Sequence, residues 1–220
     1  MKFTKDEIRK AMLLYAVTDQ MWLKEGETLA DVVESVLQNG ATFLQIREKD
    51  LPEDAFEAEA ERLKTLCARH GVPFVVNDSV EIALQCDADG VHVGQSDIKG
   101  RDIRSIIGPD KILGISAGTI EEAVAAEKAG ADYIGVGAVF PTGTKKNATP
   151  MTMELLQKIV TSVSIPVVAI GGISAENILR LCGSGVDGVA VVSAIFAADN
   201  PGKATANLLR LAKEMVDSNG

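Results

Sequence analysis

The sequence lacks several features that define particular classes of protein. Its 220 residues contain only three cysteines, Cys67, Cys86 and Cys182, which lie far apart and form no CxxC pair. We therefore expect reduced thiols rather than a disulfide framework. Lysine and arginine number 22 against 31 aspartates and glutamates, giving a net charge of −9. This excess of acidic residues argues against nucleic acid or an anionic membrane as the main partner.

Long hydrophobic runs are also missing. No apolar stretch approaches the length of a membrane span, and residues 1–7 are charged and lack the apolar core of a signal peptide. We expect a cytoplasmic protein with no membrane partner, and the sequence makes no prediction of oligomeric state. With 46% hydrophobic residues, only 4% aromatic residues and 20 glycines, the composition is typical of a soluble α/β enzyme or binding protein.

Short β-branched runs alternate regularly with amphipathic helical patterns. The predicted strands cover residues 13–17, 43–47, 74–77, 90–93, 113–116, 133–136, 167–170 and 188–192. The predicted helices cover residues 28–38, 52–70, 80–85, 100–107, 120–129, 152–162, 175–182 and 202–218. Alternation of this kind favours a parallel sheet, and eight units without room for a second domain favour a closed TIM (β/α)8 barrel over an open sheet.

An internal repeat supports this count of strands. The tripeptides at residues 40–42, 87–89, 130–132 and 185–187 each precede an even-numbered strand and begin with glycine or aspartate. A repeat of two strand–helix units suits a barrel whose interior layers draw on alternate strands. We expect one barrel domain over residues 1–220, with residues 1–12 as an N-terminal extension that covers the barrel floor.

Two strand-to-helix corners near the end of the chain indicate a phosphate site. Gly171 and Gly172 follow the seventh strand, and Val192 and Ser193 follow the eighth. Glycine lets the backbone approach an anion, and the N–H groups that open each helix point toward it. Barrels of this class hold phosphate at these two loops.

The end of the second strand carries an amide and two cations. With a period of two, Gln45, Arg47 and Lys49 share one face of the strand, and residues 44, 46 and 48 share the other. If the apolar residues face the helices, the polar ones point into the barrel mouth. A charged strand end paired at the surface is the alternative, but two cations inside a barrel need an anion or a carboxylate as partner.

Two aspartates follow neighbouring strands at the same end of the predicted barrel. Asp78 follows the third strand, and Asp97 lies just beyond the fourth. Each alone is equally consistent with a helix or turn cap. Together they favour a shared Mg2+, which binds few protein oxygens and is completed by waters and substrate phosphates.

Other polar residues extend this site. Ser116 ends the fifth strand, where it forms a hydrogen-bonding wall or a simple turn. The loop 140–150 carries Thr142, Thr144, Lys145 and Lys146, a composition that suits either a lid over an anion or a solvated basic loop.

The two histidines receive structural interpretations. His70 precedes Gly71 and is expected to end a helix, where its charge suits the helix dipole. His92 lies within a strand and is interpreted as a hydrogen-bonded core residue. No HExxH motif or Ser/His/Asp set occurs.

Two anion sites and a metal site at one mouth suggest two anionic reactants, one of them a diphosphate ester. Seven motifs also resemble the thiamine-phosphate synthase family, in order and with its spacing. They are LYAVTD (14–19), QIREKD (45–50), VNDS (76–79), HVGQSD (92–97), FPTGTKK (140–146), AIGGI (169–173) and VVSAI (191–195). Asn147 and Ser79 depart from what many members carry.

The resemblance implies a Mg2+-assisted transferase of thiamine biosynthesis. It would join 4-amino-2-methyl-5-diphosphomethylpyrimidine to 4-methyl-5-(2-phosphoethyl)thiazole or its carboxylated form, giving thiamine phosphate and diphosphate by dissociative substitution. Asp78 and Asp97 would hold Mg2+, and Arg47, Lys49 and Lys145 would be catalytic. The residues implied to contact the pyrimidine diphosphate are Gln45, Ile46, Arg47, Glu48, Lys49, Asn77, Ser116 and Lys145. The residues implied to bind the thiazole phosphate are Thr142, Thr144, Gly171, Gly172, Val192 and Ser193.

Two other functions fit the same scaffold. A thiazole tautomerase would need a group that shuttles protons and no metal, and retention of both aspartates and the cations argues against it. A non-catalytic phosphate-binding barrel would bind phosphate without releasing diphosphate. A magnesium requirement separates the first alternative from a synthase.

Overall fold

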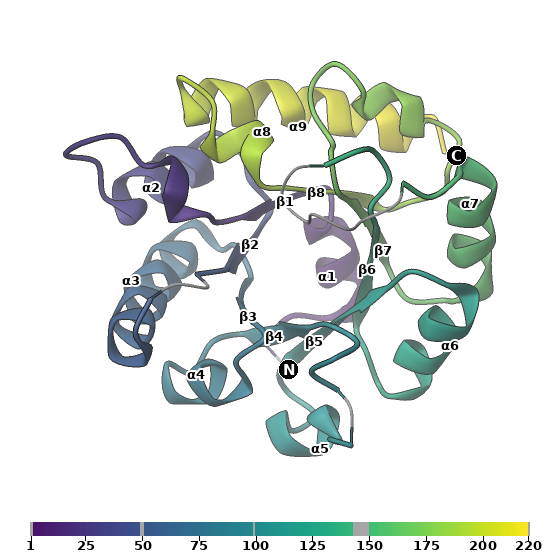
Figure 1. Ribbon diagram of the computed structural model, residues 1–220, viewed down its shortest axis with the longest axis horizontal. Helices are drawn as coiled ribbons and strands as arrows, with labels where there is room; N and C mark the ends of the chain where they lie inside the picture. The colour runs from purple at the N-terminus through teal and green to yellow at the C-terminus, as the bar shows by residue number, and fades with distance from the viewer. Residues whose placement is uncertain (1, 49–50, 99, 143–149, 220) are drawn as a thin grey trace.

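The strands form a closed parallel barrel, and the helices pack around its outside (Figure 1). The computed structural model describes residues 2–48, 51–98, 100–142 and 150–219. Each strand pairs in parallel with the next along the chain, and the last pairs with the first. The predicted (β/α)8 barrel is therefore confirmed. Within these residues, no helix is long and apolar enough to cross a bilayer.

The strands lie within one residue of the predicted bounds. They are β1 (Leu14–Val17), β2 (Phe43–Ile46), β3 (Phe74–Asn77), β4 (Gly90–Val93), β5 (Ile112–Ala117), β6 (Tyr133–Gly137), β7 (Val167–Ile170) and β8 (Gly188–Val191). Most of their residues are buried, because one face of each strand lies under the helices and the other lines the barrel interior.

The helices follow the predicted pattern with additions. The α-helices of the described residues are α1 (Lys5–Ala11), α2 (Leu29–Gln38), α3 (Glu53–His70), α4 (Val80–Gln85), α5 (Ile103–Ile107), α6 (Ile120–Lys128), α7 (Met153–Ser162), α8 (Ser193–Phe196) and α9 (Pro201–Asp217). Two short 3-10 helices are η1 (Gln20–Trp22) and η2 (Ile178–Leu181). The predicted ranges did not include α1, η1 or α8, although α8 begins at the strand-to-helix corner expected at residues 192–193.

Two predicted helices are shorter than expected. The segment 175–182 contains only the 3-10 turn η2, because the Asn177 side chain accepts from Ser174 N at 2.9 Å and donates to Gly172 O at 2.8 Å. These bonds hold the preceding residues in a loop. The segment 100–107 becomes helical only at Ile103, after Asp102 caps the helix by accepting from Ser105 N.

The internal repeat has a structural cause. The last residue of each tripeptide accepts a hydrogen bond from a backbone N–H at the start of the preceding odd-numbered strand. The pairs are Thr42 with Leu14, Asp89 with Phe74, Asp132 with Leu113 and Asp187 with Val167, at 2.8–3.0 Å. The hydrogen bonds of the repeat therefore link β1 to β2, β3 to β4, β5 to β6 and β7 to β8 at the barrel floor.

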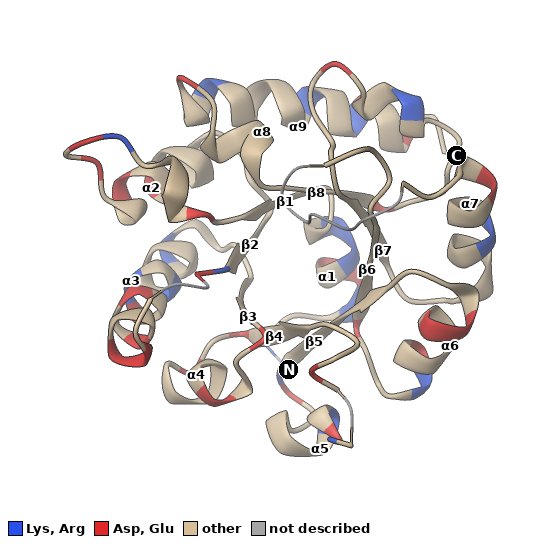
Figure 2. Cartoon of the chain, viewed as in Figure 1, with Lys and Arg blue, Asp and Glu red and all other residues tan. Residues whose placement is uncertain are grey.

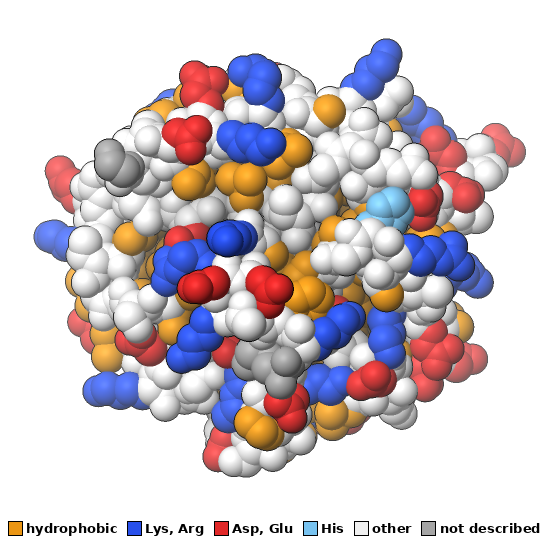
Figure 3. Space-filling model, turned by 180° about the vertical axis from the view of Figure 1, so that it is seen from behind, with side chains coloured by type: hydrophobic (Ala, Val, Ile, Leu, Met, Phe, Trp, Pro, Cys, Tyr) orange, Lys and Arg blue, Asp and Glu red, His pale blue; other side chains and the backbone are white. Residues whose placement is uncertain are grey.

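Helix α1 lies across this floor, at the centre of the ring of strands (Figure 1). A capping box between Thr4 and Glu7 starts it, and its buried Ile8 packs beneath the interior aromatic residues together with Met12. Arg9 pairs with Asp187 of the repeat. Along the ribbon, charged residues lie mostly on the helices and loops (Figure 2), and acidic and basic side chains are mixed over the face seen from behind (Figure 3).

Candidate active site

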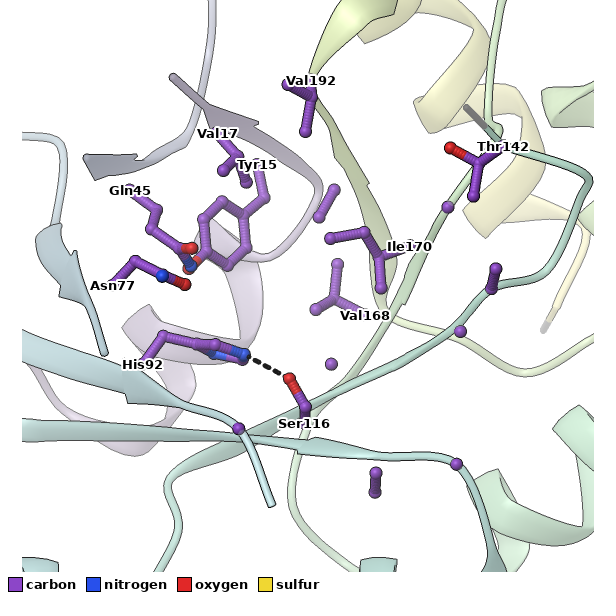
Figure 4. Close-up of a pocket in the computed structure, with 18 of the residues that line it drawn as sticks. Tyr15, Val17, Gln45, Asn77, His92, Ser116, Thr142, Val168, Ile170 and Val192 are labelled. Carbon is purple, nitrogen blue, oxygen red and sulfur yellow. Dashed lines mark hydrogen bonds between the residues drawn. The ribbon is translucent and has the colours of Figure 1, made fainter. Parts of the chain in front are cut away.

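A cavity of about 890 Å³ opens at the carboxyl ends of the strands. Gln45, Asn77 and His92 project into it from β2, β3 and β4, and Ile170 and Val192 face them from the side of β7 and β8 (Figure 4). This end of a parallel barrel is where its enzymes place their active sites. The cavity is therefore the candidate active site.

The end of β2 follows the predicted alternation. Gln45 and Arg47 line the cavity, whereas Ile46 packs in the apolar layer between strands and helices. Glu48 is also turned away from the cavity, and its buried carboxylate accepts a hydrogen bond from Thr18 Oγ1 at 2.7 Å. Of the residues expected to contact the diphosphate, the side chains of Ile46 and Glu48 are therefore not in the cavity wall.

The contacts of Glu48 indicate a structural role for its carboxylate. Burial raises the pKa of its carboxyl, and the hydrogen bond from Thr18 and the Gln20 N–H partly oppose that rise. Thr18 Oγ1 also accepts from Arg47 N at 3.0 Å. The pair of Thr18 and Glu48 thus fixes the backbone from which Arg47 reaches the cavity.

Asp78 and Asp97 both line the cavity. Asp78 adopts a positive φ of 63°, a conformation that aspartate tolerates better than most residues, and the cap of the next helix is supplied by Ser79 instead. Asp97 Oδ2 accepts from Gly94 N at 2.8 Å, which is the turn-capping bond considered from the sequence. The two carboxylates share one rim of the barrel, as a common cation would require.

Ser116 also lines the cavity, and it is bonded to His92. The distance from His92 Nε2 to Ser116 Oγ is 3.0 Å (Figure 4), and His92 Nδ1 lies 3.0 Å from the hydroxyl of Tyr133. Burial lowers the pKa of His92 to about 4, and the charge of Asp97 partly opposes this shift. His92 is thus the hydrogen-bonded residue expected from the sequence, but it also lines the cavity.

The glycine corner after β7 approaches the cavity with backbone alone. Gly171 and Gly172 have φ values of 100° and 69°. A Cβ on Gly172 would lie 2.3 Å from Pro141 O, so no larger residue fits there. Among the described residues, the N–H groups of Gly172 and Ile173 donate no hydrogen bond. They are available to an anion, as are positions Val192 and Ser193 at the start of α8, which line the same wall.

Several predicted residues fall outside the described part of the chain. These are Lys49, Thr144, Lys145 and Lys146. Thr142, the last described residue before this gap, lines the cavity.

The sequence analysis missed other residues of the cavity wall. Tyr15 points into the cavity from β1, and Gln95 lies beside Ser116, whose carbonyl accepts from Gln95 Nε2 at 2.7 Å. Alternation along β1 could have indicated Tyr15, because Tyr15 and Val17 share the interior face. Gln95 follows its strand and carries no such periodic signal.

Comparison with known proteins identifies the family. The family model described as thiamine monophosphate synthase matches residues 14–195, which include every strand of the barrel. The chain belongs to the thiamine monophosphate synthase family. The resemblance seen in the seven motifs is thereby confirmed.

Relatives within this family match over most of their length. The thiamine-phosphate synthase of Clostridium botulinum is 49% identical over 195 residues, covering 89% of this chain and 91% of the relative. That of Ruminiclostridium cellulolyticum is 51% identical, covering 84% and 87%. The solved thiamine phosphate pyrophosphorylase of Pyrococcus furiosus superposes with a TM-score of 0.86 at 40% identity, covering 94% and 98%.

Proposed function

We propose that this protein joins a pyrimidine methyl diphosphate to a thiazole phosphate, giving thiamine phosphate and diphosphate. Membership of the family supports the reaction. The observation that carries the proposal is the convergence of Arg47, Asp78 and Asp97 with the Gly172 corner on one cavity. A cation, two carboxylates and backbone N–H groups that bond to none of the described residues together suit two anionic reactants and one divalent ion.

The cation at the β2 end is suited to the departing diphosphate. Arg47 is half-buried, and no carboxylate of the described residues lies within ion-pair distance of it. A half-buried guanidinium that forms no ion pair with the described residues is stabilised by a bound anion. We assign Arg47, with Gln45, Asn77 and Ser116 nearby in the wall, to the pyrimidine diphosphate; Lys49 and Lys145 remain predicted partners of it.

The two aspartates fit a magnesium ion. Among the described residues, no group of three or more histidine, cysteine, aspartate or glutamate side chains could hold a metal. Two carboxylates are compatible with Mg2+, which keeps waters and takes its remaining ligands from substrate phosphates. Asp78 and Asp97 would hold the ion, and bound Mg2+ would neutralise charge on the diphosphate oxygens.

The residues of the cavity favour substitution by departure of the leaving group. The bond between the methylene carbon and the diphosphate oxygen breaks, and its electron pair leaves with diphosphate. The thiazole nitrogen then supplies the pair for the new carbon–nitrogen bond. Arg47 stabilises the charge that develops on the leaving oxygen, and the backbone of Gly172, with Thr142 and Ser193, holds the thiazole phosphate beside the reacting carbon.

A direct assay tests this function. The purified protein is mixed with the pyrimidine diphosphate, the thiazole phosphate and Mg2+, and thiamine phosphate and diphosphate are measured by chromatography. We expect both products in equal amounts and loss of turnover when a chelator removes Mg2+. Isomerisation of a thiazole phosphate without Mg2+ would indicate a tautomerase, and binding without diphosphate release would indicate a non-catalytic barrel.

A further inference from the structure

Five polar side chains form a continuous hydrogen-bonded chain across the barrel interior. Gln45 Nε2 contacts the Tyr15 hydroxyl, which lies 2.8 Å from the hydroxyl of Tyr133. The Tyr133 hydroxyl lies 3.0 Å from His92 Nδ1, and His92 Nε2 lies 3.0 Å from Ser116 Oγ. We call these residues the interior chain. Both of its ends, Gln45 and Ser116, line the cavity.

The packing of the barrel interior leaves room for the side chains of the interior chain. Tyr15 and Tyr133, the two tyrosines of the sequence, are both fully buried. A Cβ on Gly114 would lie 2.3 Å from the Tyr133 hydroxyl oxygen and 2.5 Å from His92 Nδ1, so glycine on β5 makes room for this contact. Buried polar groups are costly unless each finds a partner, and here each does.

A single direction of hydrogen bonding along the interior chain satisfies all five of its side chains. With its nitrogen turned toward Tyr15, the Gln45 amide donates to the Tyr15 hydroxyl, which then donates its own hydrogen to Tyr133. Tyr133 in turn donates to His92 Nδ1. A neutral imidazole that accepts at Nδ1 carries its hydrogen on Nε2, and that hydrogen is donated to Ser116 Oγ.

The direction of these bonds determines which atom Ser116 presents to the cavity. Ser116 Oγ already accepts from His92, and within the described residues no other group bonds to it. In this direction of the interior chain, the Ser116 hydroxyl hydrogen is left to point into the cavity. A donor there is attractive to an anionic oxygen, whereas a chain running the other way would present only lone pairs.

We propose that Tyr15, Tyr133 and His92 are positioning residues that hold the Ser116 hydroxyl as a hydrogen-bond donor to the pyrimidine diphosphate. This inference rests on the proposed function for the identity of the ligand. The direction of the interior chain is independent of that function. The two parts can be tested separately.

The first test measures the tautomer of His92 without any substrate. The protein is labelled with 15N, and two- and three-bond 15N–1H couplings in the histidine rings are recorded at pH 7. The sequence has only two histidines, so the variant His70→Gln assigns the remaining signal to His92. We expect the Nε2–H tautomer in the wild type and a mixture of tautomers in Tyr133→Phe. An Nδ1–H tautomer in the wild type would overturn the proposal.

The second test asks whether Tyr133 acts through Ser116. We expect Ser116→Ala to lower kcat/KM for the pyrimidine diphosphate about tenfold, the usual effect of losing one hydrogen bond to a charged group. Tyr133→Phe should lower it by a smaller factor, because a mixture of tautomers still presents the Ser116 hydroxyl as a donor in part of the molecules. The KM for the thiazole phosphate should not change. In a Ser116→Ala background, Tyr133→Phe should cause no further loss, because the hydroxyl that it orients is gone.

A matched control separates positioning from packing. Phe43 packs against the rings of Tyr15 and Tyr133, with centroids 4.4 and 5.5 Å away, but carries no polar atom. Any loss from Phe43→Leu should multiply with that of Ser116→Ala. If the losses from Tyr133→Phe and Ser116→Ala also multiply, Tyr133 only packs and the proposal is wrong. If the wild type forms no thiamine phosphate, the proposed function fails, and the tautomer measurement still decides the direction of the chain.

Discussion

Acidification should destabilise the fold through His92. Its imidazole has a pKa of about 4 in the folded protein, against a reference value of 6.5, because burial disfavours the charged ring. Between these two pH values the unfolded chain binds a proton at this residue and the folded chain does not. Stability therefore falls as the pH drops below 6.5, and the loss stops growing below pH 4.

The magnitude follows from the two pKa values. One pKa unit corresponds to about 1.4 kcal/mol, so lowering the pH from 7 to 5 should cost about 2 kcal/mol through this group alone. Other groups titrate as well, and a variant is needed to isolate this part. His92→Gln keeps a polar side chain of similar length but cannot take up the proton.

Urea unfolding at pH 7 and pH 5, in the presence of a chelator, measures this effect. The free energy of unfolding of the wild type should fall by about 2 kcal/mol more than that of His92→Gln. His70 is exposed at the end of α3, where its Nε2 lies 3.0 Å from Glu34 Oε1. His70→Gln therefore serves as the control, and its free energy of unfolding should fall as much as that of the wild type. Equal losses in the wild type and His92→Gln would refute the reasoning.

Further predictions concern the site and the floor. Asp78→Asn and Asp97→Asn should each abolish turnover without unfolding the protein, since asparagine tolerates the positive φ at position 78. Circular dichroism tests the fold and the product assay tests turnover. Full activity in both variants would contradict the metal assignment. Gly172→Ala should raise the KM for the thiazole phosphate and lower the free energy of unfolding by at least about 1 kcal/mol, because the added Cβ would clash with Pro141 O. An unchanged KM would show that the glycine corner after β7 does not bind this substrate. Asp132→Ala should cost about 3 kcal/mol in urea unfolding, since it removes a largely buried partner of Arg104 and of a strand N–H, and a change under 1 kcal/mol would contradict this.

The barrel was predictable because its signals are local. Alternation of β-branched runs and amphipathic segments depends on neighbours within one element, and the strands agree with it to within one residue. The repeat tripeptides added a second local signal, which the structure explains as side-chain bonds to an N–H at the start of the preceding odd-numbered strand. The segment 175–182 was wrongly predicted as a full helix, because the side chain of Asn177 competes with helical hydrogen bonds there.

The site was predictable where it depends on strand ends. Asp78, Asp97 and Gly172 lie on the cavity because every strand of a parallel barrel ends at the same rim. The interior chain was not predictable in this way. Tyr15 and Tyr133 are 118 residues apart in sequence, and no local pattern shows that they meet. Likewise the alternation along residues 45–49 placed Glu48 on the face away from the mouth, but no local pattern identified Thr18 as its hydrogen-bond partner.

The ion pairs at the barrel floor contrast with the position of Arg47 at the mouth, and this difference bears on function. At the floor, aspartates of the repeat pair with nearby cations. The pairs are Lys2 with Asp89, Arg9 with Asp187 and Arg104 with Asp132. At the mouth, Arg47 is half-buried with no such partner among the described residues. Because a chain with net charge −9 has many carboxylates, a guanidinium at the mouth that forms no ion pair with the described residues is best explained by an anionic ligand.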